Sequence, residues 1–107
     1  MDGVDASAPL NFEIDRDADG TTVVTVGGDL DIATTEELNA AVTPVIQDGP
    51  ARLIVDVSAL RFADSSAIAL WVRWAAQVNE LQLRGASPLL HRLISSMGLA
   101  NHLRLTS

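Results

Sequence analysis

The sequence predicts a single α/β domain built on a mixed, mostly parallel β-sheet, with an N-terminal hairpin and helices packed mainly on one face. Segments with strand character alternate with helical segments, as is typical of parallel strands joined by helices. The first two strands are instead separated by a short turn, which joins antiparallel strands. A chain of 107 residues without internal repeats has the size of one compact domain, expected over residues 10–107.

The predicted hairpin comes first. Residues 10–16 alternate apolar and polar side chains, the pattern of a half-buried strand, and residues 21–26 are rich in β-branched side chains. Residues 17–20, Asp-Ala-Asp-Gly, supply the turn between them. Gly27-Gly28 is predicted to end the second strand, so that Asp29-Leu30-Asp31 begins the connection to a helix.

The first helix is predicted from a capping-box pattern, Thr34-Thr-Glu-Glu37, in which a threonine caps the helix and an acid three residues later returns the hydrogen bond. Pro44 is expected to bend this helix or loosen its last turn, and Asp48-Gly49-Pro50 to stop it. Residues 52–57 are nearly continuous apolar sequence, which predicts a central strand ending near Val57.

The C-terminal half continues the alternation. A second helix is predicted over 66–78 and a strand over 80–84. Ser87-Pro88 opens a third helix with a cap and a proline in its first turn, and Gly98 terminates it. Leu103 and Leu105 predict a last short strand or turn. The side chains expected to be buried in the third helix are Leu90, Leu93, Ile94 and Met97.

Composition excludes several kinds of site. The chain has 14 acidic and 7 basic residues, and its net charge of −7 argues against nucleic-acid binding and favours partners that are locally basic. There is no cysteine, and His91 and His102 stand alone, so we expect no metal site and no cofactor.

The chain is also expected to be cytoplasmic and not inserted into a membrane. No apolar run approaches the length of a membrane-spanning helix, so no membrane insertion is expected. Residues 1–9 have no basic cluster and no long apolar stretch, which predicts a disordered lead-in rather than a signal peptide, and hence a cytoplasmic protein.

The Asp64-Ser65-Ser66 sequence lies where a strand gives way to a helix. Asp and Ser are preferred helix caps, so a purely structural role is one interpretation. The free N–H groups and positive dipole end of a helix start also favour a phosphate group, which is the second interpretation. Phosphate on a serine there would confront a docked partner with added negative charge, beside Asp64 and beside Asp29 and Asp31.

Four segments carry a family resemblance. Residues 28–34 are Gly-Asp-Leu-Asp-Ile-Ala-Thr, residues 53–58 are Leu-Ile-Val-Asp-Val-Ser, residues 62–67 are Phe-Ala-Asp-Ser-Ser-Ala, and residues 83–88 are Leu-Arg-Gly-Ala-Ser-Pro. In this order they resemble four parts of STAS domains, in particular bacterial anti-sigma factor antagonists: the Gly-Glu-Leu-Asp-x-Ala-Thr stretch, the third strand, the Asp-Ser-Ser-Gly or Asp-Ser-Thr-Gly signature, and the closing strand–helix unit. The resemblance covers roughly residues 12–105.

The resemblance implies a regulatory binding protein. In that family an anti-sigma factor, itself a serine kinase, phosphorylates a serine of the signature. The unphosphorylated antagonist binds the anti-sigma factor and frees a sigma factor, and a phosphatase resets the phosphorylated form. Carried over, Ser66 is the phosphoacceptor, with Ser65 as the alternative, and Asp31 and Asp64 shape the docking surface. Ala67 stands where the family usually has glycine, at a position where a partner would approach closely.

Leu70 and Trp74 are candidate partner contacts as well. On a helical wheel both fall at the border between the apolar and polar faces, where an aromatic side chain is either an interface anchor or a cover for the core rim. The chain is expected to be either a monomer or a weak dimer.

The motifs also bear on two other function classes, an enzyme and a transporter subunit. The chain has no Gly-x-Ser-x-Gly nucleophile motif and no Gly-x-x-x-x-Gly-Lys phosphate loop, so no enzyme is predicted. A STAS-like accessory subunit that binds the ATPase of a membrane transporter, without phosphorylation, is the alternative function.

Overall fold

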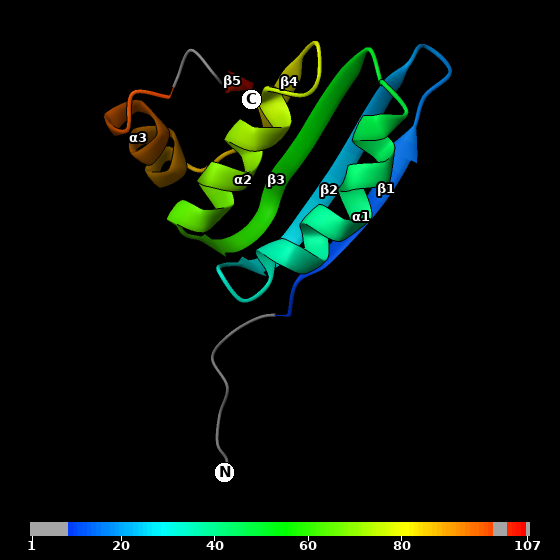
Figure 1. Cartoon of the computed structure of the whole chain (residues 1–107). Helices are drawn as coiled ribbons and strands as arrows, with labels where there is room; N and C mark the ends of the chain where they lie inside the picture. Colours follow the sequence, from blue (N-terminus) through cyan, green and yellow to red (C-terminus); the bar gives the residue numbers. More distant parts are fainter. Residues whose placement is uncertain (1–8, 100–102, 107) are drawn as a thin grey trace.

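The computed structural model describes residues 9–99 and 103–106, and it confirms the predicted fold class. A five-stranded sheet runs in the order β1-β2-β3-β4-β5, in which only β1 and β2 pair antiparallel (Figure 1). The elements are β1 (Asn11–Arg16), β2 (Thr21–Leu30), α1 (Thr35–Gln47), β3 (Arg52–Ala63), α2 (Ser65–Ala75), β4 (Leu81–Arg84), α3 (Pro88–Ser96) and β5 (Arg104–Thr106).

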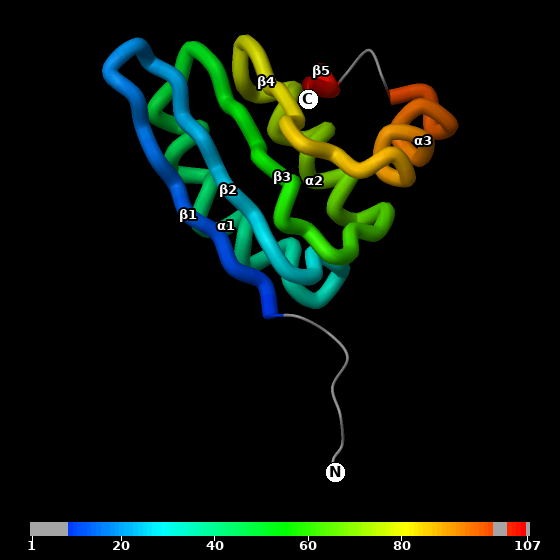
Figure 2. The backbone as a smooth tube through the Cα atoms, turned by 180° about the vertical axis from the view of Figure 1, so that it is seen from behind, coloured from blue at the N-terminus to red at the C-terminus, as the bar shows by residue number. Residues whose placement is uncertain are grey.

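The core lies between the sheet and two helices. Helices α1 and α2 cover the same face, and the opposite face is open when the molecule is seen from behind (Figure 2). Helix α3 lies beyond α2, on the β5 side of the molecule. The inward side chains of the central strands and of α2 form one apolar cluster, which includes Val24, Val55, Leu83, Ile68 and Trp71.

Strands β2 and β3 are both longer than predicted. β2 continues through Gly27-Gly28 to Leu30, so the two glycines do not end it. A Cβ atom on Gly27 would lie 2.8 Å from Oδ1 of the Asn11 side chain on β1, which would have to move to make room for it. β3 passes Val57 and runs to Ala63.

The extended part of β3 is irregular. Its pairing with β2 shifts register between Thr25 and Gly27 and again between Gly28 and Asp29. Such bulges bend a strand, and β3 curves at its C-terminal end toward the start of α2 (Figure 1). The long strand pair carries the β2–α1 and β3–α2 connections to the same end of the sheet.

The capping box predicted at α1 does not form. Thr34 precedes the helix, but its hydroxyl makes no capping hydrogen bond to it. Instead Thr34 Oγ1 accepts a hydrogen bond from the Asp31 N–H at 3.0 Å and approaches the Asp29 carbonyl oxygen as a donor at 3.1 Å. The hydroxyl thus closes the preceding loop. The predicted stop at the other end is confirmed, since Asp48 and Gly49, with φ +68°, follow the helix. Pro44 lies within the last turn, and the helix continues past it to Gln47.

Helix α3 has the predicted ends but not the predicted buried face. Ser87 Oγ accepts a hydrogen bond from the Leu90 N–H at 3.2 Å, and Gly98, with φ +74°, follows the helix. Leu90 and Ile94 are buried, whereas Leu93 and Met97 are 38% and 47% exposed. The expectation that all four are buried is therefore wrong, because α3 packs beside the main layer and only one side of it meets the core.

Other boundaries differ modestly. Helix α2 ends at Ala75 rather than residue 78, and the predicted last strand is present as β5. The lead-in predicted for residues 1–9 lies, apart from Pro9, outside the described residues. No helix within the described ranges is long and apolar enough to cross a membrane.

Candidate functional site

The β3–α2 corner is organised by Asp64, which caps α2. One carboxylate oxygen, Oδ1, accepts hydrogen bonds from the backbone N–H groups of Ser66 at 2.9 Å and Ala67 at 3.3 Å. The Ser66 hydroxyl donates to the same oxygen. These bonds satisfy N–H groups that a helix start leaves unpaired, so the capping role predicted for this turn is present.

Asp64 also carries a stable negative charge. Burial raises the pKa of Asp64, but hydrogen bonds from the Ser66 hydroxyl and from the N–H groups of Ala67, Ser66 and Ile32 outweigh burial and hold it below the ordinary value of 3.8. The carboxylate is therefore charged at neutral pH and faces the positive end of the α2 dipole.

The two serines differ in surroundings. Ser66 is half-buried and its hydroxyl is held by Asp64, whereas Ser65 is exposed. Among the described residues, the Ser65 hydroxyl has no hydrogen-bond partner. A phosphate on Ser66 would replace the proton donated to Asp64 and place two anionic groups in contact. A phosphate on Ser65 would leave the Asp64 cap intact.

The β2–α1 loop lies directly beside this corner. β2 and β3 remain paired as far as Leu30 and Ala63, and the Asp64 N–H donates to the Leu30 carbonyl at 3.3 Å. In the loop, Asp31 Oδ1 accepts a hydrogen bond from the Ala33 N–H at 2.9 Å. The predicted acids Asp29 and Asp31 are thus brought to the same end of the sheet as Asp64.

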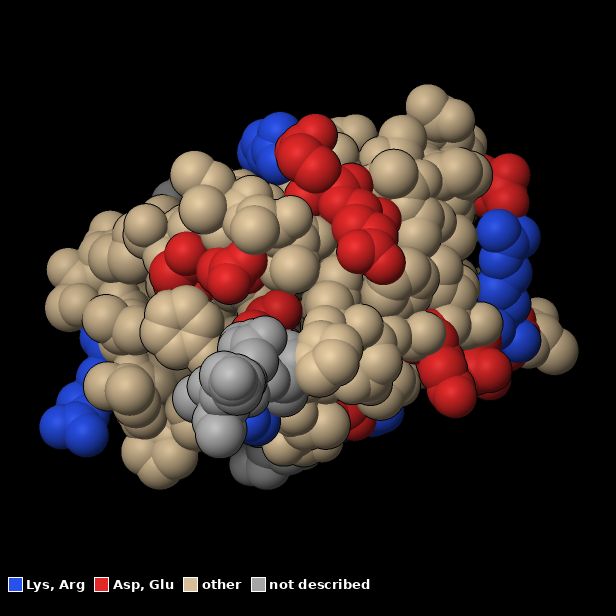
Figure 3. Space-filling view, turned by 90° about the horizontal axis from the view of Figure 1, so that it is seen from below, with Lys and Arg blue, Asp and Glu red and all other residues tan. Residues whose placement is uncertain are grey.

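Figure 3 looks onto this end of the molecule. Acidic side chains gather over its middle, while most basic side chains lie toward the margins. Because clustered carboxylates attract positive charge, this end of the molecule suits a basic group on a partner. Among residues 9–99 and 103–106, no cluster of histidines and carboxylates could hold a metal ion.

Three residues expected at the partner surface are instead in the core. Ala67, Leu70 and Trp74 are at most 1% exposed. The border positions inferred for Leu70 and Trp74 from the helical wheel, and the contact that the resemblance implies at the Ala67 side chain, are therefore not on the surface. The wheel treats α2 alone, but α1 packs against the border on which Leu70 and Trp74 lie. The Trp74 indole Nε1 donates a hydrogen bond to Asn39 Oδ1 of α1 at 3.0 Å. The Ala67 methyl group likewise faces inward, away from an approaching partner.

Two exposed apolar side chains that were not predicted as site residues flank the corner. Ile32, in the β2–α1 loop, is 78% exposed, and Phe62, two residues before Asp64, is 52% exposed. Both are apolar residues within two positions of an acid, Asp31 or Asp64, in a chain segment predicted to be a connection. That combination is the signal that could have identified them.

The chain is similar to known proteins along most of its length. Residues 14–106 match the family model described as "Mlab, STAS domain". An anti-sigma-B factor antagonist from Staphylococcus aureus is 35% identical over 80 residues, which make up 71% of this chain and 74% of that protein. The anti-sigma-F factor antagonist RsfB from Mycobacterium tuberculosis is 29% identical over 105 residues, covering 94% of this chain and 86% of that protein.

A solved structure shows the same arrangement. The crystal structure of an anti-sigma factor antagonist from Mycobacterium paratuberculosis has a TM-score of 0.82 to this chain at 26% sequence identity. The similarity covers 92% of this chain and 86% of that one.

Proposed function

Because this chain belongs to the STAS domain family, we propose that it is an anti-sigma factor antagonist, which binds an anti-sigma factor at the Asp64-Ser65-Ser66 turn and thereby frees a sigma factor. The family match over residues 14–106 and the relatives that carry this name support the proposal. The main structural support is the geometry of the Asp64-Ser65-Ser66 turn. Asp64, held charged by four hydrogen-bond donors, lies beside two serines at the start of α2 and next to the acidic β2–α1 loop.

The partner is an anti-sigma factor that is also a serine kinase, and phosphorylation of the turn switches binding off. A phosphoserine carries a charge of about −1.5 to −2. On Ser66 it would displace the hydrogen bond to Asp64 and add to the charge of Asp64 and Asp31. A basic docking surface that fits the unmodified turn would then meet a rearranged, more acidic one. A phosphatase would restore the first state.

Ser66 is the proposed phosphoacceptor, and Ser65 is the alternative. The Ser66 hydroxyl has a fixed position, since Asp64 accepts its hydrogen bond, and it occupies the second serine position of the signature. Exposure favours Ser65. The turn is a substrate of the kinase in this proposal, and the chain itself has a binding role rather than a catalytic one.

Phosphosite mapping tests the assignment. The purified chain is incubated with the anti-sigma factor kinase of the same organism and ATP, and the mass of the intact chain is measured. Wild type is expected to gain one phosphate, Ser66→Ala none, and Ser95→Ala, an exposed serine in α3, one. Retention of the phosphate in Ser66→Ala but not in Ser65→Ala would move the site to Ser65.

Binding separates the two candidate functions. The unphosphorylated chain is expected to bind the anti-sigma factor, and the phosphorylated chain to bind at least about tenfold more weakly, as close like charges at an interface cost several kcal/mol. Absence of phosphorylation and of anti-sigma factor binding, together with tight binding to the ATPase of a membrane transporter, would replace this function with the alternative one. Incorporation of phosphate by the chain alone, without the kinase, would contradict the non-catalytic role.

A further inference from the structure

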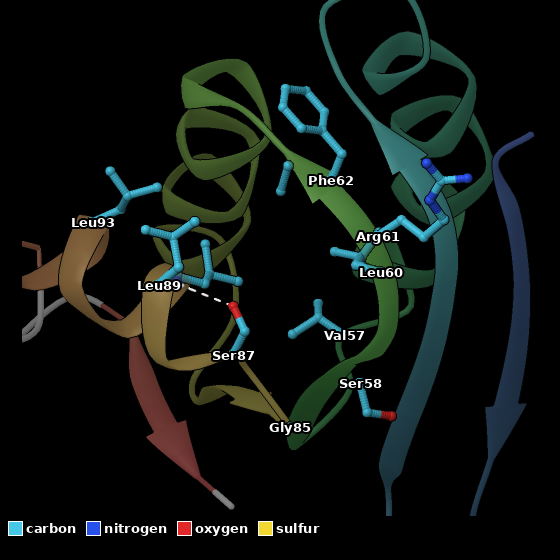
Figure 4. Close-up of a pocket in the computed structure, with 11 residues that line it drawn as sticks. Val57, Ser58, Leu60, Arg61, Phe62, Gly85, Ser87, Leu89 and Leu93 are labelled. Carbon is cyan, nitrogen blue, oxygen red and sulfur yellow. Dashed lines mark hydrogen bonds between the residues drawn. The ribbon is translucent and has the colours of Figure 1, made fainter. Parts of the chain in front are cut away.

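An open apolar groove lies between the C-terminal half of β3 and the first turns of α3. It has a volume of about 250 Å³. Leu60 and Phe62 line it from β3, and Leu89 and Leu93 line it from α3, with Val57 between them (Figure 4). A cavity of about 150 Å³ accepts a benzene ring, so this space admits a side chain of leucine or phenylalanine size.

The groove follows from the unequal lengths of the strands. β4 pairs with β3 only from Leu53 to Asp56 and ends at Arg84. β3 runs on to Ala63, and over this stretch α3 rather than a strand is its neighbour on that side. Gly85 permits the turn into α3 at close range, since a Cβ atom there would lie 2.7 Å from Ser58 Cβ. A helix set against a curving strand leaves the space between them open.

The rim of the groove exposes an unusual share of apolar surface. Five large apolar side chains of the described residues are exposed, and three of them, Phe62, Leu89 and Leu93, line this groove. Leu89, in the first turn of α3, is 62% exposed. Apolar side chains gathered in this way on a protein surface mark a binding site.

The two serine hydroxyls that line the groove already hydrogen-bond within the protein. Ser58 Oγ donates to Asp56 Oδ1 at 2.7 Å, and Ser87 Oγ accepts from the Leu90 N–H. The one ionisable lining residue, Arg61, points away from the groove toward β2 (Figure 4). Two carboxylates adjoin lining residues along the chain. Asp56, before Val57, pairs with Arg84 at 3.0 Å, and Asp64 directly follows the lining residue Ala63.

We propose that this groove receives an apolar side chain from a segment of the anti-sigma factor, and that a basic residue of the same segment meets Asp64 and Asp31. This inference rests on the proposed function and names the chemistry of the partner. The groove is continuous with the turn through Ala63, and the acidic end of the molecule complements a basic group. An apolar anchor in a pocket next to a charged contact is a common source of binding energy and orientation.

The test uses substitutions on one helix. Leu89→Gln and Leu93→Gln remove apolar rim atoms from the groove. Met97→Gln is the matched control, since Met97 is an exposed apolar residue just after α3 that does not line the groove. Affinity for the purified anti-sigma factor kinase of the same organism is measured with the unphosphorylated chain, and circular dichroism melting checks that each variant is folded.

Leu89→Gln and Leu93→Gln are each expected to bind about tenfold more weakly than wild type, and Met97→Gln within about twofold of it. Wild-type affinity in both groove variants would overturn the inference and leave the proposed function standing. Equal weakening in all three variants would also overturn the groove assignment. A wild-type chain that does not bind the kinase would remove the proposed function and the inference together.

Two further measurements exclude other occupants. Light scattering would show a wild-type dimer that Leu89→Gln converts to a monomer if a second copy filled the groove. Native mass spectrometry would show an acyl-chain adduct, lost in Leu89→Gln, if a lipid filled it. Either result would overturn the inference. The inference expects the same oligomeric mass for wild type and Leu89→Gln, and no acyl-chain adduct in wild type.

Discussion

The indole Nε1 of Trp74 donates a 3.0 Å hydrogen bond to Asn39 Oδ1, and this bond joins α2 to α1 at the centre of the helical layer. Together with the buried side chains of α2, this bond contributes to holding the helix in one rotation about its axis. Asp64 at the start of α2 takes its position from the same helix, so the packing of the layer and the geometry of the turn are linked.

Replacing the acceptor should destabilise the domain. Asn39→Ala leaves the buried indole N–H of Trp74 without a partner, and we expect the free energy of unfolding to fall by about 1–3 kcal/mol. Asn39→Asp keeps an acceptor oxygen and should lose less. Urea unfolding followed by tryptophan fluorescence measures both, and equal losses in the two variants would show that the hydrogen bond contributes little.

The contribution of the Asp64 cap to stability should be separable from the contribution of its negative charge. Asp64→Ala removes the acceptor for the Ser66 and Ala67 N–H groups and should lower the free energy of unfolding by about 1 kcal/mol. Asn is as good a capping residue as Asp, so Asp64→Asn should retain most of that stability while removing the charge. Thermal melting at pH 7 checks this order, and a loss in Asp64→Asn as large as in Asp64→Ala would contradict it.

The stability that Asp64 contributes should depend on pH in the acid range. Its pKa in the folded chain lies below the ordinary value of 3.8, so the folded state binds fewer protons there than the unfolded state does. This stabilisation is present in full above that value and is lost as pH falls through the lower, folded pKa. Urea midpoints between pH 2 and 7 should therefore fall less steeply in Asp64→Asn than in wild type. Parallel curves would refute the role of this carboxylate.

Restoring the family's glycine should harm stability without changing docking. Ala67→Gly removes a buried methyl group and adds a flexible residue to a helix, and we expect a loss of about 1–2 kcal/mol in the free energy of unfolding. Affinity for the anti-sigma factor kinase should stay within about twofold of wild type, because the methyl group faces the core. A clear gain in affinity would show that a partner approaches this position after all.

The elements that the sequence predicted well are those whose signals are local. Ser87-Pro88 and Gly98 fix the ends of α3 through a side-chain cap, a proline and a left-handed glycine, which need no tertiary partner. Asp64 is a helix cap on the same grounds. The mostly parallel sheet with its N-terminal hairpin was predicted from the alternation of elements along the chain, whereas the order of the strands within the sheet comes from the structure.

The sequence alone thus determined the fold class, the turn at Asp64 and the acidic character of the chain, because periodicity, capping and charge are properties of short segments. Only the tertiary structure decided which faces are covered. Leu70 and Trp74 are buried in the common core, where Trp74 also bonds to α1, and Leu93 is exposed because α3 is displaced to the side of the sheet. The lengths of β2 and β3 depend on their mutual pairing, and that pairing places Asp31, Asp64 and the apolar groove at one end of the molecule.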